Sequence, residues 1–414
     1  MAQFSELGVS PQLLTILTAA GFTEPTPIQL KAIPLARTGK DIIGIAQTGT
    51  GKTLAFGIPV IEQLVGQRLH RALMVVPTRE LALQVEESLM RLTRPIGMQT
   101  VVLIGGAPLS DQIRRLRAAP QIIIGTPGRI IDHLERRSLD LRMVKHVVLD
   151  EADRMLDMGF APQIRTIMDT VPTERQTLLF SATMPADIVR IAQKYMQLPL
   201  RVEIAPAGTT ASHVTQEIFF VKKEQKLPML SVLLKEYTGS VLVFSRTKHG
   251  AKKMARSLYG LGHTATDIHS NRTLAQRKEA LAGFKTGKYR VLVATDIAAR
   301  GIDVTGIELV INYDVPENPE DYVHRIGRTG RAGKKGHAIT FVQPDQRHKV
   351  RQIEQLVRAG LRISPVPELP NLPQTEPRPE RYEAPVFERP TWGRSYSSQR
   401  PAGNGPRHRR RTYR

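Results

Sequence analysis

The sequence contains no cysteine among its 414 residues. Disulfide bonds and thiolate metal sites are therefore excluded, and the lack of disulfides fits a reducing compartment. No uninterrupted apolar stretch approaches about 18 residues, so we expect no membrane-spanning helix. Residues 1–7 lack a basic start followed by an apolar core and give no sign of a signal peptide. The expected setting is the cytoplasm, without a membrane partner.

Acidic residues are scarce relative to basic ones. The chain has 38 Asp and Glu against 59 Lys and Arg, a formal charge of +21. A field of that sign concentrates polyanions, most commonly nucleic acid and less often anionic membrane. The alternative is a basic surface that only keeps the protein in solution. With 41% hydrophobic residues, the chain is long enough for two globular domains.

Short β-branched runs alternate with amphipathic, helix-like stretches throughout residues 1–364. The strand candidates are apolar on both faces, as buried parallel strands are, and residues 78–92 carry apolar side chains at helical spacing. This alternation predicts an α/β fold with parallel sheets and right-handed crossovers. The strands expected in the first half are residues 42–45, 72–76, 99–104, 121–124, 146–149 and 176–180.

The pattern pauses at a turn-rich stretch of small residues, 205–212, which is typical of an interdomain linker. We expect a first domain at residues 1–205, a linker at 206–213 and a similar second domain at 214–364, closed by a helix at about 346–359. The strands expected in the second half are residues 214–221, 241–244, 265–269, 291–295, 309–313 and 336–342.

From residue 365 the composition changes: ten of the last fifty residues are proline, ten are arginine and none is lysine. Too little apolar material is present to fold, so we expect a disordered tail at residues 365–414. Arginines interleaved with aromatic residues, including the single tryptophan Trp392, suit loose RNA contact through charge and stacking. The alternative is a solubilising tail with no specific role.

A glycine-rich turn follows the apolar run at residues 42–45 and should join a strand to a helix. Gly49 and Gly51 let the backbone approach phosphate oxygens, and the following helix adds its positive N-terminal end. Lys52 should reach the β and γ phosphates, and the Thr53 hydroxyl should ligate Mg²⁺. Ala46 stands where the first glycine of the general pattern falls. The expected nucleotide-binding loop comprises Ala46, Gln47, Thr48, Gly49, Thr50, Gly51, Lys52 and Thr53.

Asp150, Glu151, Ala152 and Asp153 close another apolar run. At the end of a strand, Asp150 is placed to hold Mg²⁺, while Glu151 can orient and polarise an attacking water. Acidic residues at strand ends also cap helices, and we expect Asp153 to have a positional role, pairing with a basic group of the other domain. The two clusters together predict hydrolysis of a nucleoside triphosphate.

These residues resemble the DEAD-box ATP-dependent RNA helicases of superfamily 2, and the likeness spans about residues 4–345. Residues 21–29 resemble the family's Q motif. The resemblance implies two tandem RecA-like domains, with Gln29 reading the adenine edge and Phe4 stacking on the base. A glutamine offers both a donor and an acceptor, which suits adenine. ATP and Mg²⁺ are the cofactors that the resemblance implies.

Further motifs of the first half resemble the family's RNA-contact elements. Arg79, Thr126 and Arg129 would bind phosphates, and the glycines would allow close backbone approach. The segment containing Ser181 and Thr183 resembles the one that couples the nucleotide site to strand separation. The residues expected to contact RNA are Pro77, Thr78, Arg79, Gly105, Gly106, Thr126, Pro127, Arg129 and Thr295.

In the second half, residues 241–247, 295–303 and 324–331 resemble motifs IV, V and VI. The likeness implies that Asp303 contacts the ATP ribose, that His324 couples the two sites, and that Arg328 and Arg331 are arginine fingers. A finger is worth on the order of 10³–10⁵ in rate in well-studied NTPases.

One segment departs from the family pattern. Ser270 replaces a usual glycine and Leu274 a usual glutamine, although Arg277 is in position. The departure weakens any assignment of RNA contacts to this segment. The tail and the motif spellings look most like bacterial members of an RhlE-like branch.

The mechanism we expect is a clamp, in which ATP and RNA together close the two domains and complete the active site. Grip on phosphates predicts weak sequence preference, and the reaction would unwind short duplexes and remodel RNA–protein complexes, including ribosomal or RNA-decay assemblies. Two other readings are a DNA translocase on the same motor and an RNA-annealing chaperone that uses ATP little. The sequence does not indicate an oligomeric state.

Overall fold

The computed structural model describes residues 3–47, 49–204, 214–299, 304, 306–330 and 335–370. The predicted linker, nearly all of the predicted tail, and the predicted site residues Thr48, Asp303 and Arg331 lie outside the described residues. We call residues 3–204 the first lobe and residues 214–370 the second lobe. No helix within the described ranges is long and apolar enough to cross a membrane.

The first lobe is built on a seven-stranded parallel sheet with the strand order β3-β4-β2-β5-β6-β1-β7. Its short apolar runs become buried strands because helices cover both faces. Its strands are β1 (Ile42–Ile45), β2 (Arg71–Val75), β3 (Thr100–Leu103), β4 (Ile122–Gly125), β5 (Val144–Leu149), β6 (Gln176–Ser181) and β7 (Leu200–Glu203).

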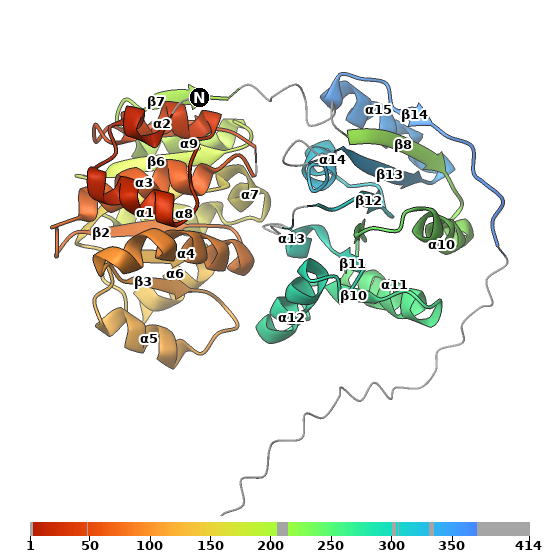
Figure 1. The fold of residues 1–414 in the computed structure, drawn as a ribbon, viewed down its shortest axis with the longest axis horizontal. Helices are drawn as coiled ribbons and strands as arrows, with labels where there is room; N and C mark the ends of the chain where they lie inside the picture. Colours follow the sequence, from red (N-terminus) through yellow and green to blue (C-terminus); the bar gives the residue numbers. More distant parts are fainter. Residues whose placement is uncertain are drawn as a thin grey trace, which may run out of the picture. The chain divides into compact units, whose positions relative to one another are not determined.

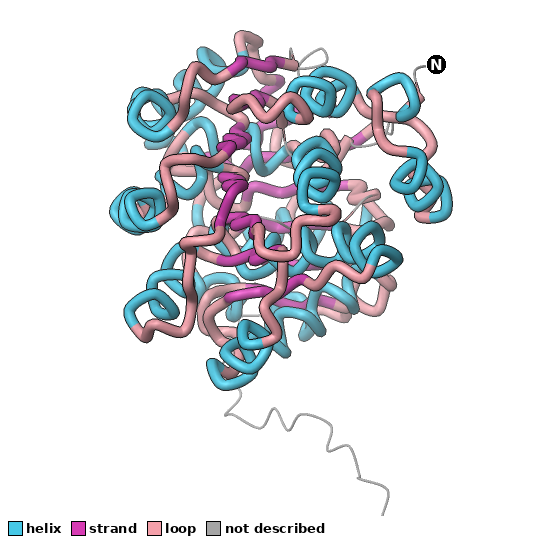
Figure 2. The backbone as a smooth tube through the Cα atoms, turned by 90° about the vertical axis from the view of Figure 1, so that its left-hand side faces the viewer, coloured by secondary structure: helices cyan, strands magenta, loops and turns pink. Residues whose placement is uncertain are grey.

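Helices lie on both faces of this sheet, and Figure 2 shows the strands as a central stack with helices on either side. Two apolar clusters fill the spaces between sheet and helices, one on each face. The helices are α1 (Pro11–Ala19), α2 (Pro27–Ala36), α3 (Lys52–Leu64), α4 (Arg79–Thr93), α5 (Leu109–Arg117), α6 (Pro127–Glu135), α7 (Ala152–Asp157), α8 (Ala161–Thr170) and α9 (Ala186–Tyr195), with 3₁₀ turns at Phe4–Leu7 and Arg94–Ile96.

The second lobe repeats this topology. Its parallel sheet has the order β10-β11-β9-β12-β13-β8-β14, which is the order of the first sheet with every strand number raised by seven (Figure 1). Its strands are β8 (Val214–Phe220), β9 (Val241–Phe244), β10 (Ala265–Ile268), β11 (Val291–Ala294), β12 (Leu309–Asn312), β13 (Gly336–Val342) and β14 (Arg362–Ile363). Its helices are α10 (Lys226–Glu236), α11 (Lys248–Gly260), α12 (Leu274–Lys285), α13 (Asp296–Ala299), α14 (Pro319–Ile326) and α15 (Arg347–Val357), with 3₁₀ turns at Lys223–Gln225 and Pro344–Gln346.

The α/β fold with two similar parallel units is confirmed, and every predicted strand is present within a residue or two of its expected ends. Two edge strands, β7 and β14, were not predicted. Val366 and Leu369, which lie within the predicted tail, pack against an apolar cluster of the second lobe.

Candidate functional site

The strand order brings the two predicted ATPase motifs together. Because β6 lies between β5 and β1, the carboxyl ends of these three strands are neighbours. The phosphate loop follows β1, Ser181 ends β6, and Asp150 follows β5. Ligands of open parallel sheets bind at this edge, outside the carboxyl ends of the strands. Residues separated by about a hundred positions in the sequence thus share one site.

Gly51 gives the phosphate loop its sharp turn into α3. It has φ +91°, the left-handed region that glycine adopts at low cost, and it is the N-cap of the helix. A Cβ atom at this position would lie 2.5 Å from the Gln29 amide nitrogen and 2.8 Å from the Thr26 hydroxyl. Gly51 is therefore required by both the backbone conformation and the neighbouring Q-motif residues. The N-terminus of α3 that it exposes is suited to bind phosphate.

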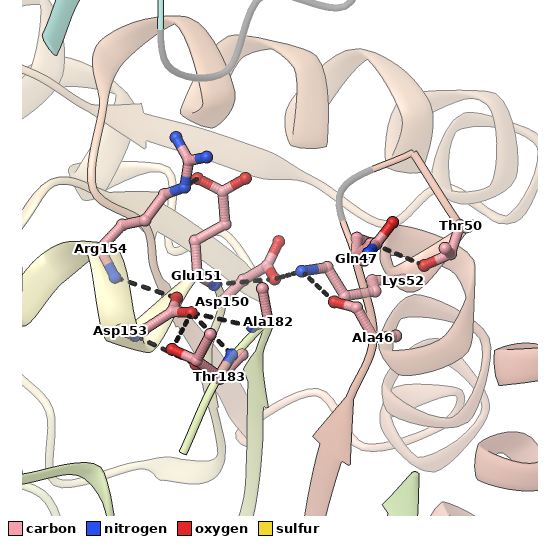
Figure 3. A network of polar contacts seen from close by, with 11 residues as sticks. Ala46, Gln47, Thr50, Lys52, Asp150, Glu151, Asp153, Arg154, Ala182 and Thr183 are labelled. Atoms are coloured by element: carbon pink, nitrogen blue, oxygen red, sulfur yellow. Dashed lines mark hydrogen bonds and ion pairs between the residues drawn. The ribbon is translucent and has the colours of Figure 1, made fainter. Parts of the chain in front are cut away.

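Lys52 is buried and directed at the acidic motif (Figure 3). Its Nζ donates to the Ala46 carbonyl at 3.1 Å and lies 3.8 Å from Asp150 Oδ1. Burial raises the pKa of Asp150 to about 6, and the charge of Lys52 opposes that rise. A cation bound at Asp150 would favour the ionised carboxylate further.

Glu151 is held in a strained backbone conformation. Its φ of 51° and ψ of 49° lie in the left-handed region, which costs a residue with a side chain about 1–2 kcal/mol. Its Oε2 atom is 3.7 Å from Nε of Arg154, and neither atom has a hydrogen-bond partner although both side chains are buried. The carboxylate therefore keeps acceptor capacity for a water molecule beside the phosphate loop.

A cavity of about 370 Å³ joins these groups to the Q motif. Phe4 is buried in its wall, and Gln29 is anchored by both ends of its amide, which donates to the Gly51 carbonyl at 2.9 Å and accepts from the Thr26 N–H at 2.9 Å. Gln29 is thus tied to the phosphate loop itself. The cavity is lined by Phe4, Phe22, Glu24, Thr26, Gln29, Gly49, Gly51, Lys52, Thr53, Leu54, Leu81, Gln84, Ser88, Asp150, Glu151 and Arg328.

The predicted Mg²⁺ ligands, Thr53 and Asp150, line the same cavity. Within the described ranges, no group of three or more His, Cys, Asp or Glu could hold a metal alone. Mg²⁺ commonly takes one or two protein oxygens and completes its shell with substrate phosphates and water. The Thr53 hydroxyl and the Asp150 carboxylate, beside a phosphate loop, fit this coordination pattern.

Asp153 connects the acidic motif to the predicted coupling segment. Its Oδ2 accepts three hydrogen bonds, from the N–H groups of Ala182 and Thr183 at 3.0 and 2.9 Å and from the Thr183 hydroxyl at 2.9 Å (Figure 3). Its own N–H donates to the Ser181 hydroxyl. Burial would raise the pKa of Asp153, but the charge of Lys52, the bonds from Thr183 and the charge of His324 lower it. Asp153 is thus bound by hydrogen bonds within the first lobe and also senses the charge of His324 on the second.

The first-lobe residues predicted to contact RNA follow the other three neighbouring strands of the first sheet, β3, β4 and β2. Thr78 caps α4 by accepting the Leu81 N–H at 3.2 Å. The Arg79 guanidinium packs against Gly105 and Gly106 so closely that a Cβ on Gly106 would lie 2.5 Å from it. Thr126, Pro127 and Arg129 open α6 directly after β4. One sheet edge thus carries both predicted sites, side by side.

In the second lobe, Thr295 follows β11, and Arg328 follows α14 and lines the nucleotide cavity. Arg325, which had no predicted role, fixes α14. It makes two bonds to Asp296, at 2.5 and 2.7 Å, and donates to the Asp314 carbonyl at 2.6 Å.

The segment that departs from the family pattern contacts the first lobe. Arg277 Nε lies 2.6 Å from Glu80 Oε1, and both side chains are buried. Leu274 packs against an apolar cluster of the first lobe. Leucine at the place of the family's glutamine therefore makes an apolar contact here.

Three further residues of the first lobe were missed by sequence reasoning: Arg154, Gln112 and His133. Arg154 follows the acidic motif directly, and its adjacency was the available signal. Gln112 and His133 form a buried contact at 3.3 Å across 21 positions of sequence, for which no spacing rule gives a signal.

The fold and the site define an α/β nucleoside triphosphatase with two lobes of the same topology. The sequence matches the family model described as DEAD/DEAH box helicase over residues 26–191 and the one described as helicase conserved C-terminal domain over residues 223–333. It is 48% identical over 360 residues to the ATP-dependent RNA helicase CshA of Listeria monocytogenes, covering 86% of this chain and 69% of that protein. The chain belongs to the DEAD-box ATP-dependent RNA helicase family.

A second sequence relative and two solved structures are consistent with this family assignment. The chain is 46% identical over 357 residues to the DEAD-box ATP-dependent RNA helicase CshA of Bacillus subtilis, covering 86% of this chain and 72% of that protein. Its structure resembles S. cerevisiae Dbp5 bound to RNA and ADP BeF3, with a TM-score of 0.80, 30% identity and coverage of 88% and 96% of the two chains. Mss116p bound to ssRNA and AMP-PNP gives a TM-score of 0.81, 28% identity and coverage of 89% and 80%.

Proposed function

We propose that the chain hydrolyses ATP when RNA is bound and uses the reaction to separate short RNA duplexes and remodel RNA–protein complexes. The observation that carries this proposal is the shared sheet edge. Lys52 follows β1 through the phosphate loop, and Asp150 and Glu151 follow β5. The RNA contacts predicted in the first lobe follow β2, β3 and β4.

Each group at the nucleotide site has a role that its surroundings support. Lys52 and the N-terminus of α3 bind the triphosphate, and Phe4 and Gln29 hold the adenine. Glu151 orients the attacking water, because its Oε2 atom is buried without a hydrogen bond. Arg328, which lines the same cavity, stabilises charge that develops on the transferred phosphoryl group. Arg331 and Asp303 have the roles expected from the family motifs.

Thr53 and Asp150 are the residues that would hold Mg²⁺. When bound, the ion neutralises phosphate charge and helps to orient the triphosphate. The raised pKa of Asp150 supports this assignment, because a buried carboxylate without a strong cation is costly to ionise.

RNA binding and ATP hydrolysis are coupled through Asp153, Ser181 and Thr183, and by closure of the two lobes. Contact through phosphates makes sequence preference weak and salt dependence strong, and 2′-OH contacts favour RNA over DNA. The sequence relatives in Listeria monocytogenes and Bacillus subtilis are CshA proteins, so assignment to an RhlE-like branch rests on the motif spellings and the tail. Ribosomal or RNA-decay complexes as targets, and a cytoplasmic setting, stay predictions.

Glu151→Gln tests the proposal. The variant keeps the shape of the side chain but cannot act as a base, so RNA-stimulated turnover should fall by about 10²–10⁴ while ATP and RNA still bind. The measurements are steady-state ATPase with RNA and with DNA of the same sequence, and RNA affinity with ATP present.

Glu174→Gln is the matched control, because Glu174 lies just before β6, at the opposite edge of the sheet, and is fully exposed. It should behave as wild type. Turnover of Glu151→Gln at the wild-type rate would reject the role of Glu151, and equal stimulation by DNA would reject the preference for RNA.

A further inference from the structure

A buried amide encloses the glycine pair of the first lobe. The Gln112 side chain, on α5, accepts the Ile104 N–H at 3.1 Å through Oε1. Its Nε2 donates to the carbonyls of Ile104 at 3.1 Å and Ala107 at 3.2 Å, with Pro108 at 3.4 Å. A flipped amide would set like groups against each other, so only this orientation satisfies the network. Both ends of the Gly105–Gly106 loop are therefore fixed by one side chain.

A buried imidazole on α6 completes the network. His133 Nε2 lies 3.3 Å from Gln112 Oε1, and its Nδ1 lies 2.8 Å from the Ser138 hydroxyl. Because the amide oxygen can only accept, Nε2 carries the hydrogen. In the neutral ring Nδ1 is then an acceptor for the Ser138 hydroxyl, whose oxygen also lies 3.1 Å from the His133 carbonyl. Burial and the nearby charge of Arg129 lower the pKa of His133, which favours this neutral ring.

The network connects segments of the first lobe and does not itself contact a ligand. Gln112 is 4% exposed and His133 is fully buried, so neither can touch RNA. His133 is on the helix whose first turn carries Arg129, and Gln112 holds the loop against which the Arg79 guanidinium packs. Residues proposed to bind successive phosphates thus depend on two side chains that no ligand reaches.

We infer that Gln112 and His133 are positioning residues for RNA: their hydrogen bond sets the spacing between the Gly105–Gly106 loop and α6, and so the spacing of the phosphate contacts. The inference rests on the proposed RNA role of these segments. The nucleotide groups follow β1, β5 and β6, whereas this network joins the segments after β3 and β4. Loss of the network should therefore affect RNA binding without affecting ATP binding.

Gln112→Leu removes the amide and keeps a similar volume. We expect the RNA concentration for half-maximal ATPase to rise about tenfold, the size of one lost buried hydrogen-bonded contact, with kcat at saturating RNA and ATP affinity without RNA unchanged. Binding is measured by fluorescence anisotropy of labelled single-stranded polyuridylate with a non-hydrolysable ATP analogue.

Gln176→Leu is the matched control for general loss of stability. Gln176 is also 4% exposed, and its amide donates to the carbonyls of Ala36 and Lys40, both at 2.7 Å, at the start of β6. Both variants should lower the melting temperature, but only Gln112→Leu should weaken RNA binding. Equal RNA affinities of the two variants would overturn the inference.

His133 provides the rescue. His133→Leu should weaken RNA binding as Gln112→Leu does, and His133→Gln, whose amide can still donate to Gln112, should recover part of it. No difference between these two variants would contradict the proposed hydrogen bond.

Arg129→Ala separates this inference from the proposed function. If Arg129→Ala weakens RNA binding and Gln112→Leu does not, only the positioning role fails. If neither weakens it, the RNA role of this sheet edge fails, and the inference fails with it.

Discussion

Replacing Asp153 by asparagine tests how the ATPase motif is joined to the coupling segment. The Oδ2 atom accepts three hydrogen bonds from Ala182 and Thr183, and Oδ1 accepts the Arg154 N–H at 2.9 Å. An asparagine of the same shape has one oxygen, so it cannot serve both sides. Its better orientation turns the oxygen toward Ala182 and Thr183 and the NH₂ group toward the N–H of Arg154.

The magnitude follows from these contacts. One buried N–H loses its acceptor, which costs about 1–3 kcal/mol, and three charge-assisted bonds become neutral ones. Asp153 is 4% exposed, so solvent does not screen the loss. We expect a destabilisation of the first lobe of about 3 kcal/mol. RNA unwinding should fall more than ATP hydrolysis, because the lost bonds hold the coupling segment rather than the phosphate loop.

The assay is a double-mutant cycle with Thr183→Val, which removes only the hydroxyl bond. Urea unfolding of the full chain is followed by circular dichroism, with the transitions of the two lobes fitted separately. The double variant should be more stable than the sum of the single losses predicts, by about 1 kcal/mol, since the charge-assisted part of the Thr183 hydroxyl bond is counted in both single losses. Additive losses, or a loss below about 0.5 kcal/mol for Asp153→Asn, would refute this reasoning.

Two further predictions concern a histidine and a glycine. Burial lowers the pKa of His146 from 6.5 to about 4, so between these pH values the unfolded chain binds a proton that the folded chain does not, and the free energy of unfolding falls with pH by at most about 3 kcal/mol. His146→Gln should flatten this fall in urea titrations over that pH range, and an unchanged slope would exclude His146 as its source. Gly106→Ala would set a Cβ 2.5 Å from the Arg79 guanidinium and should weaken RNA binding about tenfold in anisotropy titrations. Gly97→Ala, also at positive φ but with open space around it, should lower the free energy of unfolding by about 1 kcal/mol and leave RNA affinity unchanged, so equal RNA affinities of the two variants would contradict the role of the contact with Arg79.

Most strands could be predicted because a parallel strand covered on both faces must be apolar throughout. β4, with the sequence Ile-Ile-Ile-Gly, is buried along its whole length. β7 and β14 were missed because they are edge strands that are not apolar throughout. β7 has one buried residue, Val202, and β14 consists of two exposed residues, so neither carries the pattern.

The residue types of the site could be predicted from the sequence, but much of the geometry of these residues could not. Lys52, Asp150 and Glu151 stand in local patterns that a phosphate loop and a strand end require. The left-handed backbone of Glu151 and its approach to Arg154 have no local signal. The bond between Gln112 and His133 depends on how α5 and α6 pack, which no periodicity of either helix specifies.

Strand order is the property that the sequence left open, and because it is the same in both lobes it identifies the residues of the second lobe that correspond to the nucleotide site of the first. β8 and β12 are the counterparts of β1 and β5, and Lys226 and Asp314 stand where Lys52 and Asp150 stand in the first lobe. Lys226 begins α10 as Lys52 begins α3, and its Nζ lies 3.0 Å from Asp314 Oδ1.

No glycine-rich turn precedes Lys226, however; the chain reaches it through a 3₁₀ turn at Lys223–Gln225. Its Nζ also donates to the Tyr313 carbonyl at 2.7 Å, so the charge that would meet a phosphate is satisfied within the lobe. The same lysine–aspartate pair is therefore a binding group beside an open loop and a structural ion pair without one. The Arg328 side chain of the second lobe lines the cavity beside the phosphate loop of the first.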